Sequence, residues 1–111
     1  MDNSTDIYIH KDAQFNGNLE SKGSIEISGV FIGNIKCPEN VFIDSTATVT
    51  SEINALHVTV KGSFYGKIIA DEITLLKDSY LEGNITTKKL IMEKGAVFVG
   101  NSKKLYEKIA S

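Results

Sequence analysis

The chain has 111 residues, which is enough for one domain with a modest core. Its hydrophobic fraction of 41% and charged fraction of 23% are typical of a folded protein and exclude wholesale disorder. The net charge is −2 and all 12 basic residues are Lys, so the sequence offers neither a concentrated basic surface for nucleic acid nor an Arg to clamp phosphate.

Cysteine content and the N-terminal sequence predict a cytoplasmic location. Cys37 is the single cysteine, which excludes a disulfide within the chain, and the N-terminus shows no signal peptide. The apolar runs are far shorter than the ~20 residues that span a bilayer. Residues 1–6 are polar and acidic, so we expect them to be a poor membrane anchor and any location at the inner face of the cell membrane to be peripheral.

Alternation of apolar and polar residues with period 2 begins at Ile7 and recurs until Lys103, without a helical period. In chain order we expect a polar segment with a first strand in residues 1–11, a β-structured body in residues 12–102, and a short cap or tail in residues 103–111. The sequence therefore predicts a single all-β domain.

A short pattern repeats along this body: an aromatic or aliphatic residue, any residue, Gly, any residue, then an aliphatic residue. Its copies are separated by 16, 18, 15, 17 and 17 residues, and the third copy has Ser51 in place of Gly. The copies begin at Phe15, Phe31, Val49, Phe64, Leu81 and Phe98.

Other positions of the repeat recur with the same spacing, and each set of equivalent positions is called a column below. Two residues before each start the residue is small, and a second apolar pair, such as Ile25 with Ile27, follows nine to twelve residues after it. A repeat of about 17 residues is too short for a helix pair or a propeller blade. It suits one coil of a β-solenoid, in which equivalent residues stack about 4.8 Å apart.

The glycines at the third position of the repeated pattern, called the column glycines below, have two candidate explanations. Glycine may be needed to leave room beside the stacked Phe column, or to let the backbone turn at positive φ. The Asn that follows four of these glycines favours the turn, because Asn tolerates the left-handed region.

The order of these columns resembles the bactofilin family. The segments that resemble it most are residues 30–37 (VFIGNIKC) and residues 93–100 (EKGAVFVG), and the resemblance covers roughly residues 12–100. It implies a right-handed, three-sided β-helix of about six coils. It also implies a homopolymer that assembles without nucleotide into filaments in which like ends meet like ends, and that recruits cell-wall-modifying or membrane proteins in cell-shape control.

The sequence departs from the family pattern at both ends. Residues 1–6 do not resemble the hydrophobic or basic membrane-targeting segment of many members, and the chain stops soon after the last predicted coil, without a proline-rich tail. Direct membrane attachment and recruitment through a tail are therefore not expected.

A solenoid exposes unpaired strand edges at both ends, which must be capped or paired. We predict assembly through Val97, Phe98, Val99 and Leu105 at the C-terminal end, and through Ile7, Ile9, Phe15 and Leu19 at the N-terminal end. The resemblance implies an assembly role for Phe98 in particular. The alternative is that Phe98 is simply the last core residue, covered by residues 103–110.

A second predicted surface flanks the Phe column on the outside of the coils. Its positions are mostly β-branched or aromatic with little charge, and we predict that Val30, Ile32, Tyr65 and Tyr80 among them form a lateral contact face. Such a face suits filament bundling or partner docking. Ordinary β-propensity on a solvated sheet explains the same residues equally well.

The sequence predicts no enzyme and no cofactor. His10 and His57 lack a Cys or carboxylate pattern at ligand spacing, so no metal site is expected, and no small-molecule or nucleic-acid partner is indicated. Two alternatives stay open: a hexapeptide-type acyltransferase, whose six-residue period and long His-bearing loop are missing here, and a monomeric solenoid adaptor.

Overall fold

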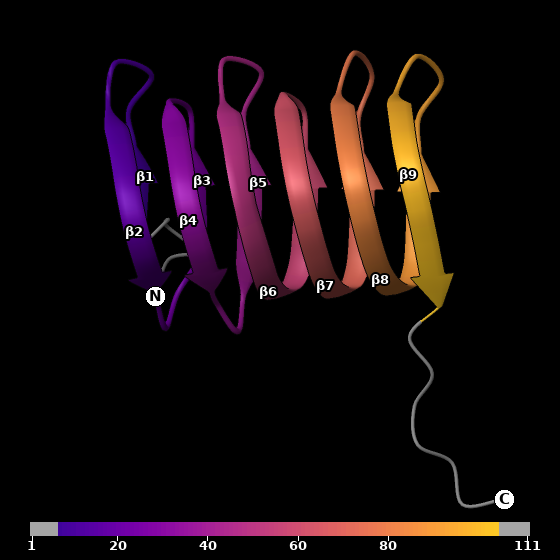
Figure 1. The fold of residues 1–111 in the computed structure, drawn as a ribbon, viewed down its shortest axis with the longest axis horizontal. Coiled ribbons are helices and arrows are strands. Elements are labelled where there is room, and N and C mark those ends of the chain that lie inside the picture. The colour runs from indigo at the N-terminus through magenta and orange to yellow at the C-terminus, as the bar shows by residue number, and fades with distance from the viewer. Residues whose placement is uncertain (1–6, 105–111) are drawn as a thin grey trace, which may run out of the picture.

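The computed structural model describes residues 7–104, and its nine strands form one parallel sheet wound into a solenoid (Figure 1). The strands are β1 (Ile7–Ile9), β2 (Gln14–Glu20), β3 (Ile25–Ile27), β4 (Val30–Lys36), β5 (Asn40–Ile43), β6 (Thr48–Val60), β7 (Ser63–Leu75), β8 (Tyr80–Met92) and β9 (Val97–Lys104).

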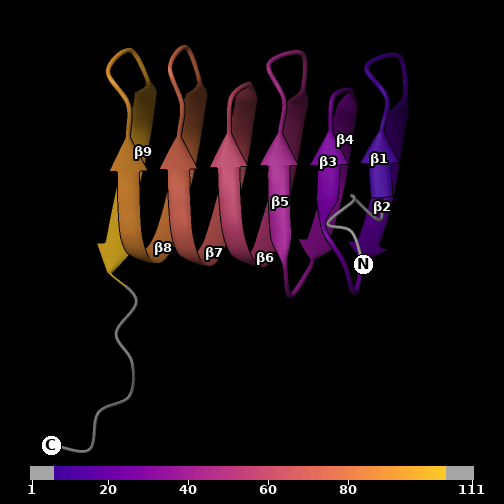
Figure 2. The same cartoon turned by 180° about the vertical axis from the view of Figure 1, so that it is seen from behind.

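The coil is right-handed. Figure 1 shows the front strands running downward while the chain advances from β2 to β9, and Figure 2 shows the strands of the opposite face running upward. This arrangement confirms the predicted all-β solenoid of about six coils with roughly 17 residues per turn.

Each coil continues the register of the one before it. β6 pairs with β4 from Thr48 to Asn54 and with β5 from His57 to Val60, so one long strand runs where two separate strands run in the coil before it. β1 lies within residues 1–11, and β9 extends to Lys104, two residues beyond the predicted end of the β-helix.

Three corners divide a coil into three sides. One lies at the column glycine. A second lies where the register skips a residue, as at Leu56 and Asp71, between the pairs Ala55–Ala70 and His57–Glu72. The third is a tight turn closed by a hydrogen bond three residues back, such as Ala47 N–H to the Asp44 carbonyl at 3.0 Å.

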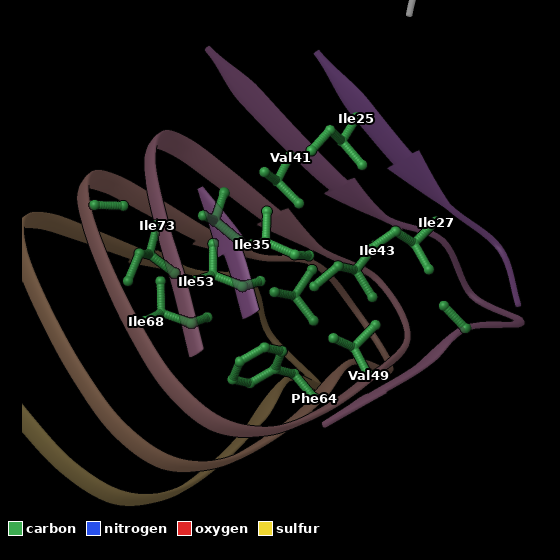
Figure 3. Close-up of a cluster of buried hydrophobic side chains, with 14 of the residues drawn as sticks. Ile25, Ile27, Ile35, Val41, Ile43, Val49, Ile53, Phe64, Ile68 and Ile73 are labelled. Carbon is green, nitrogen blue, oxygen red and sulfur yellow. The ribbon is translucent and has the colours of Figure 1, made fainter. Parts of the chain in front are cut away.

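The predicted ladders fill the interior of the coil (Figure 3). In the Phe column, Phe31, Val49, Phe64 and Leu81 are all 0% exposed. Phe15 stacks on Phe31 with ring centroids 5.1 Å apart and planes 4° apart. Because each large side chain packs against its equivalent in the next coil, the core is a set of continuous columns parallel to the long axis.

The column glycines are required by the backbone itself. Gly17, Gly33, Gly66, Gly83 and Gly100 have φ between 133° and 143°, which agrees with the turn explanation. The explanation based on room beside the Phe rings is wrong, because a Cβ on Gly83 would lie 1.8 Å from the carbonyl oxygen of Gly66 in the preceding coil. Stacked backbone therefore excludes the side chain.

Gly17 is the informative exception, because β2 is the first strand in its stack among the described strands. Within residues 7–104, a Cβ at Gly17 would meet only the Phe15 side chain, at 3.8 Å. We expect Gly17→Ala to lose about 1–3 kcal/mol of unfolding free energy from backbone strain alone. Gly83→Ala should lose distinctly more because it adds the backbone clash. Urea denaturation at matched protein concentration measures the difference, and equal losses would contradict the stacking argument.

Candidate functional site

The titratable side chains of the described residues form no metal-binding cluster. Within residues 7–104, no three side chains of His, Cys, Asp or Glu are grouped so as to hold a metal ion. His57 lies on the surface, with Nε2 3.3 Å from Glu72 Oε1 and Nδ1 3.1 Å from Asn40 Oδ1. These contacts join neighbouring coils.

A hollow of about 530 Å³ lies beside the wide corners of the first coils, lined by Glu20, Ser21, Lys22, Lys36, Cys37, Pro38 and Asn54. The Cys37 thiol is buried in this corner, and its Sγ lies 3.0 Å from the carbonyl oxygen of Gly23. We assign this hollow no chemistry.

The N-terminal end exposes the edges of two strands. Among the described strands, β1 pairs with β3 alone and β2 with β4 alone. Ile7, Phe15 and Leu19 are partly exposed, whereas their equivalents in the next coil, Ile25, Phe31 and Ile35, are 1%, 0% and 2% exposed. Ile9, the fourth predicted residue, is 7% exposed. Among residues 7–104, this end is therefore an open cross-section of the core.

The C-terminal end exposes β9 and the second half of β8. Phe98 lies over Leu81 and is partly exposed, as is Leu90, which lies over Ile73. Met92 continues the same inward column as the fully buried Leu75 and is 44% exposed. Leu105 lies outside the described residues.

The sequence-based prediction for this end omitted Leu90 and Met92. It also grouped Val97 and Val99 with Phe98, although their side chains face the other way. Leu90 and Met92 are the last members of the second apolar pair, so that column itself could have identified them. Val97 and Val99 lie in β9, but they face outward with exposures of 45% and 47%, whereas Phe98 between them faces the core. Val97 and Val99 therefore border the lateral surface as well as the end.

The four predicted lateral residues lie on one face of the sheet formed by β4, β7 and β8. Ile32 and Tyr65 are 45% and 36% exposed, and Val30 and Tyr80 are partly exposed. The Tyr65 and Tyr80 rings are 5.8 Å apart. Tyr80 donates a hydrogen bond to Glu82 at 2.9 Å, and this bond raises the pKa of Tyr80 above its ordinary value.

No helix within the described range is long and apolar enough to cross a membrane. The surfaces that stand out among residues 7–104 are the two open ends and the weakly charged lateral face. All three suit contacts with protein rather than with a small molecule.

Proteins with the same fold have been solved. A structure of Thermus thermophilus bactofilin double helical filaments matches with a TM-score of 0.84 over 88% of this chain and 98% of that chain, at 27% identity. The solid-state NMR structure of the cytoskeletal bactofilin BacA matches with a TM-score of 0.82 over 90% of this chain and 96% of that chain, at 30% identity.

A curated relative and a family comparison point the same way. Bactofilin BacO of Myxococcus xanthus is 27% identical over 86 residues, which cover 77% of this chain and 68% of BacO. The polymer-forming cytoskeletal family matches residues 7–103, nearly all of the described range. Since this match spans well over half of its length, the chain belongs to the bactofilin family.

Proposed function

We propose that this protein is a structural subunit, not an enzyme, that assembles end to end into filaments without nucleotide. The observation that carries the proposal is the pair of open ends, where core columns stop at partly exposed residues such as Phe15 and Phe98. The Thermus thermophilus relative, whose solved structure is a filament, supports it.

Stacking a second copy on either end removes two unfavourable features together. Unpaired N–H and C=O groups of β2 or β9 find partners, and apolar side chains that are partly exposed become buried like their equivalents in inner coils. Each fully buried side chain of this size gains about 1.5–3 kcal/mol from the hydrophobic effect. This mechanism depends on shape and backbone pairing, so it needs no nucleotide.

The polarity of the filament follows from which ends meet. In accordance with the family resemblance, we propose that like ends meet, so that N-terminal and C-terminal junctions alternate along the filament. Each junction is then a two-fold interface that uses the same surface of both copies. Blocking one end should consequently stop growth at a dimer.

This arrangement is testable by substitutions at one end at a time. We expect Phe98→Arg to form dimers through its N-terminal end, Leu19→Arg to form dimers through its C-terminal end, and the double variant to be monomeric. The physical reason is that a guanidinium at an open end places an unpaired charge in the junction. Sedimentation velocity gives the species, and circular dichroism checks that each variant keeps its β structure.

Other outcomes of this experiment are equally informative. Monomers from either single variant would contradict the like-end arrangement and indicate a head-to-tail filament. Filaments formed by Phe98→Arg would contradict the assembly role of Phe98. Phe64→Arg is the comparison variant, because Phe64 lies in the same column and is 0% exposed. This variant should lose the β spectrum, whereas Phe98→Arg at the end of the column should keep it.

We also propose that the lateral face joins filaments side by side. The face combines Val30 and Ile32 with Tyr65 and Tyr80, and the filaments solved for the Thermus thermophilus relative are double. Burial of a weakly charged face that carries apolar and aromatic side chains favours such contacts. In this arrangement the two ends control growth and the lateral face controls bundling.

Charges placed on the lateral face should separate single from paired filaments. We expect Tyr65→Glu combined with Tyr80→Lys to form single filaments of normal length, because desolvating charged side chains opposes lateral contact. The matched control, Thr59→Glu combined with Thr74→Lys, changes neighbouring outward positions on the β6–β7 wall of the second apolar pair. Filament widths in electron micrographs distinguish the two, and unchanged bundling would contradict the proposal.

In the cell, we propose that the filaments act as a cytoplasmic scaffold for cell-shape or cell-wall-remodelling factors, held peripherally at the inner face of the membrane. A filament repeats each surface site at every subunit, so binding that is weak for one chain becomes strong through multivalency. Recruitment of partners would therefore depend on assembly, and variants blocked at one end should fail to localise.

A further inference from the structure

The edge strand of the N-terminal end reads nearly the same in both directions. β2 is Gln14-Phe15-Asn16-Gly17-Asn18-Leu19-Glu20, with Gly17 at its centre. The glycine is flanked first by two Asn residues, then by two large apolar residues, and finally by an amide and a carboxylate. The other glycine-containing strands lack this symmetry: in β7 the central Gly66 lies between Tyr65 and Lys67.

Such symmetry matters because two-fold pairing of an edge strand is antiparallel. In a two-fold interface, if residue i contacts residue j of the partner, then j contacts i. Pairing β2 with its copy about Gly17 places Phe15 opposite Leu19, Asn16 opposite Asn18, and Gln14 opposite Glu20 of the second copy. Apolar residues meet apolar residues, amides meet amides, and no two like charges face each other.

The second edge strand of the same end has the same property. β1 is Ile7-Tyr8-Ile9, so pairing about Tyr8 places Ile7 opposite Ile9 of the partner. Figures 1 and 2 show β1 and β2 on opposite faces of the solenoid, running in opposite directions. One two-fold axis perpendicular to the long axis can therefore pass through both strands.

Gly17 leaves space for such a partner. In inner coils the Cβ direction of a column glycine points at the backbone of the preceding coil, as at Gly33, where it would lie 1.8 Å from the carbonyl oxygen of Gly17. Among residues 7–104, no residue stacks on the N-terminal side of Gly17, so the same direction points out of the N-terminal end of the described coils. A second backbone can approach there as closely as one coil approaches the next.

The C-terminal end is less symmetric. Pairing β9 with its copy about Gly100 would place Phe98 opposite Ser102 and Val97 opposite Lys103. Both pairs join an apolar residue to a polar one. The N-terminal end is thus the better candidate for two-fold edge pairing.

We infer that two copies join at their N-terminal ends by antiparallel pairing of β2 with β2 and β1 with β1, about a two-fold axis through Gly17 and Tyr8. The inference rests on the proposed like-end assembly and specifies its register. Asn18 already accepts a hydrogen bond from Asn34 through Oδ1 at 3.0 Å. Its amide N–H groups are oriented by that bond, and one of them donates to Asn16 of the partner.

Disulfide cross-linking tests this register in the Phe98→Arg background, where only the N-terminal junction is available. Directly opposed residues in an antiparallel pair have Cα atoms about 4.5–5.5 Å apart, within disulfide range. A mixture of Gln14→Cys and Glu20→Cys chains should therefore cross-link under mild oxidation. Either variant alone should not, because two copies of position 14 would lie roughly 20 Å apart along the strands.

The outcomes separate the register from the proposed function. Dimers in sedimentation without the mixed cross-link, or cross-linking of Gln14→Cys alone, would overturn the register while like-end assembly stands. Absence of dimers in the Phe98→Arg background would overturn both. The Phe98→Arg chain without an added cysteine is the control, since its native Cys37 is 2% exposed.

Charge at position 14 gives an independent readout. Within its own chain, Gln14 is paired with Val30, so a charge there gains no cross-strand ion pair inside the monomer. Opposite Glu20 of the partner, Gln14→Lys should tighten the dimer and Gln14→Glu should weaken it, each by roughly two- to thirtyfold for the two pairs at the junction. Equal dissociation constants for the two variants would overturn the proposed pairing.

Discussion

Every coil of this solenoid is held by the parallel backbone hydrogen bonds that it makes with the coil beside it. That ladder fixes which residues stack, so a large apolar side chain in an inner coil packs against its inward-facing equivalents in the adjacent coils. The clearest consequence is at Gly83, where the carbonyl of Gly66 fills the space that a Cβ would occupy. The ladder of hydrogen bonds therefore determines which residue types each column of stacked residues can hold. The same pairing can continue beyond the first and last described coils of one chain.

The two ends are where the ladder stops, and the assembly account depends on them. At an inner coil Phe64 is 0% exposed, whereas Phe15 and Phe98 keep part of their surface in contact with solvent. The lateral face is separate, since it belongs to outward columns that end at Val97 and Val99. Growth and bundling are thus assigned to different surfaces, and each can be altered without the other.

Much of the fold could be predicted because the repeated pattern of residues is visible in the sequence. The Phe and Ile columns gave the coil length and the inward positions. The right-handedness of the coil was predicted from the family resemblance, because the length of a sequence repeat does not tell in which direction the chain winds. The crowding at Gly83 arises from backbone of another coil, which no local pattern shows. Leu90 and Met92 were missed at the C-terminal end because the last coil is incomplete, and only stacking reveals that nothing among residues 7–104 covers them.

The central claim is that stacking alone builds the polymer. It is tested most directly by negative-stain electron microscopy of the unmodified protein at micromolar concentration, with no nucleotide or metal added. The account predicts filaments whose abundance rises with protein concentration and does not change when nucleotide is supplied. A uniform population of small particles across that concentration range would contradict it and favour a monomeric solenoid that binds partners through its faces.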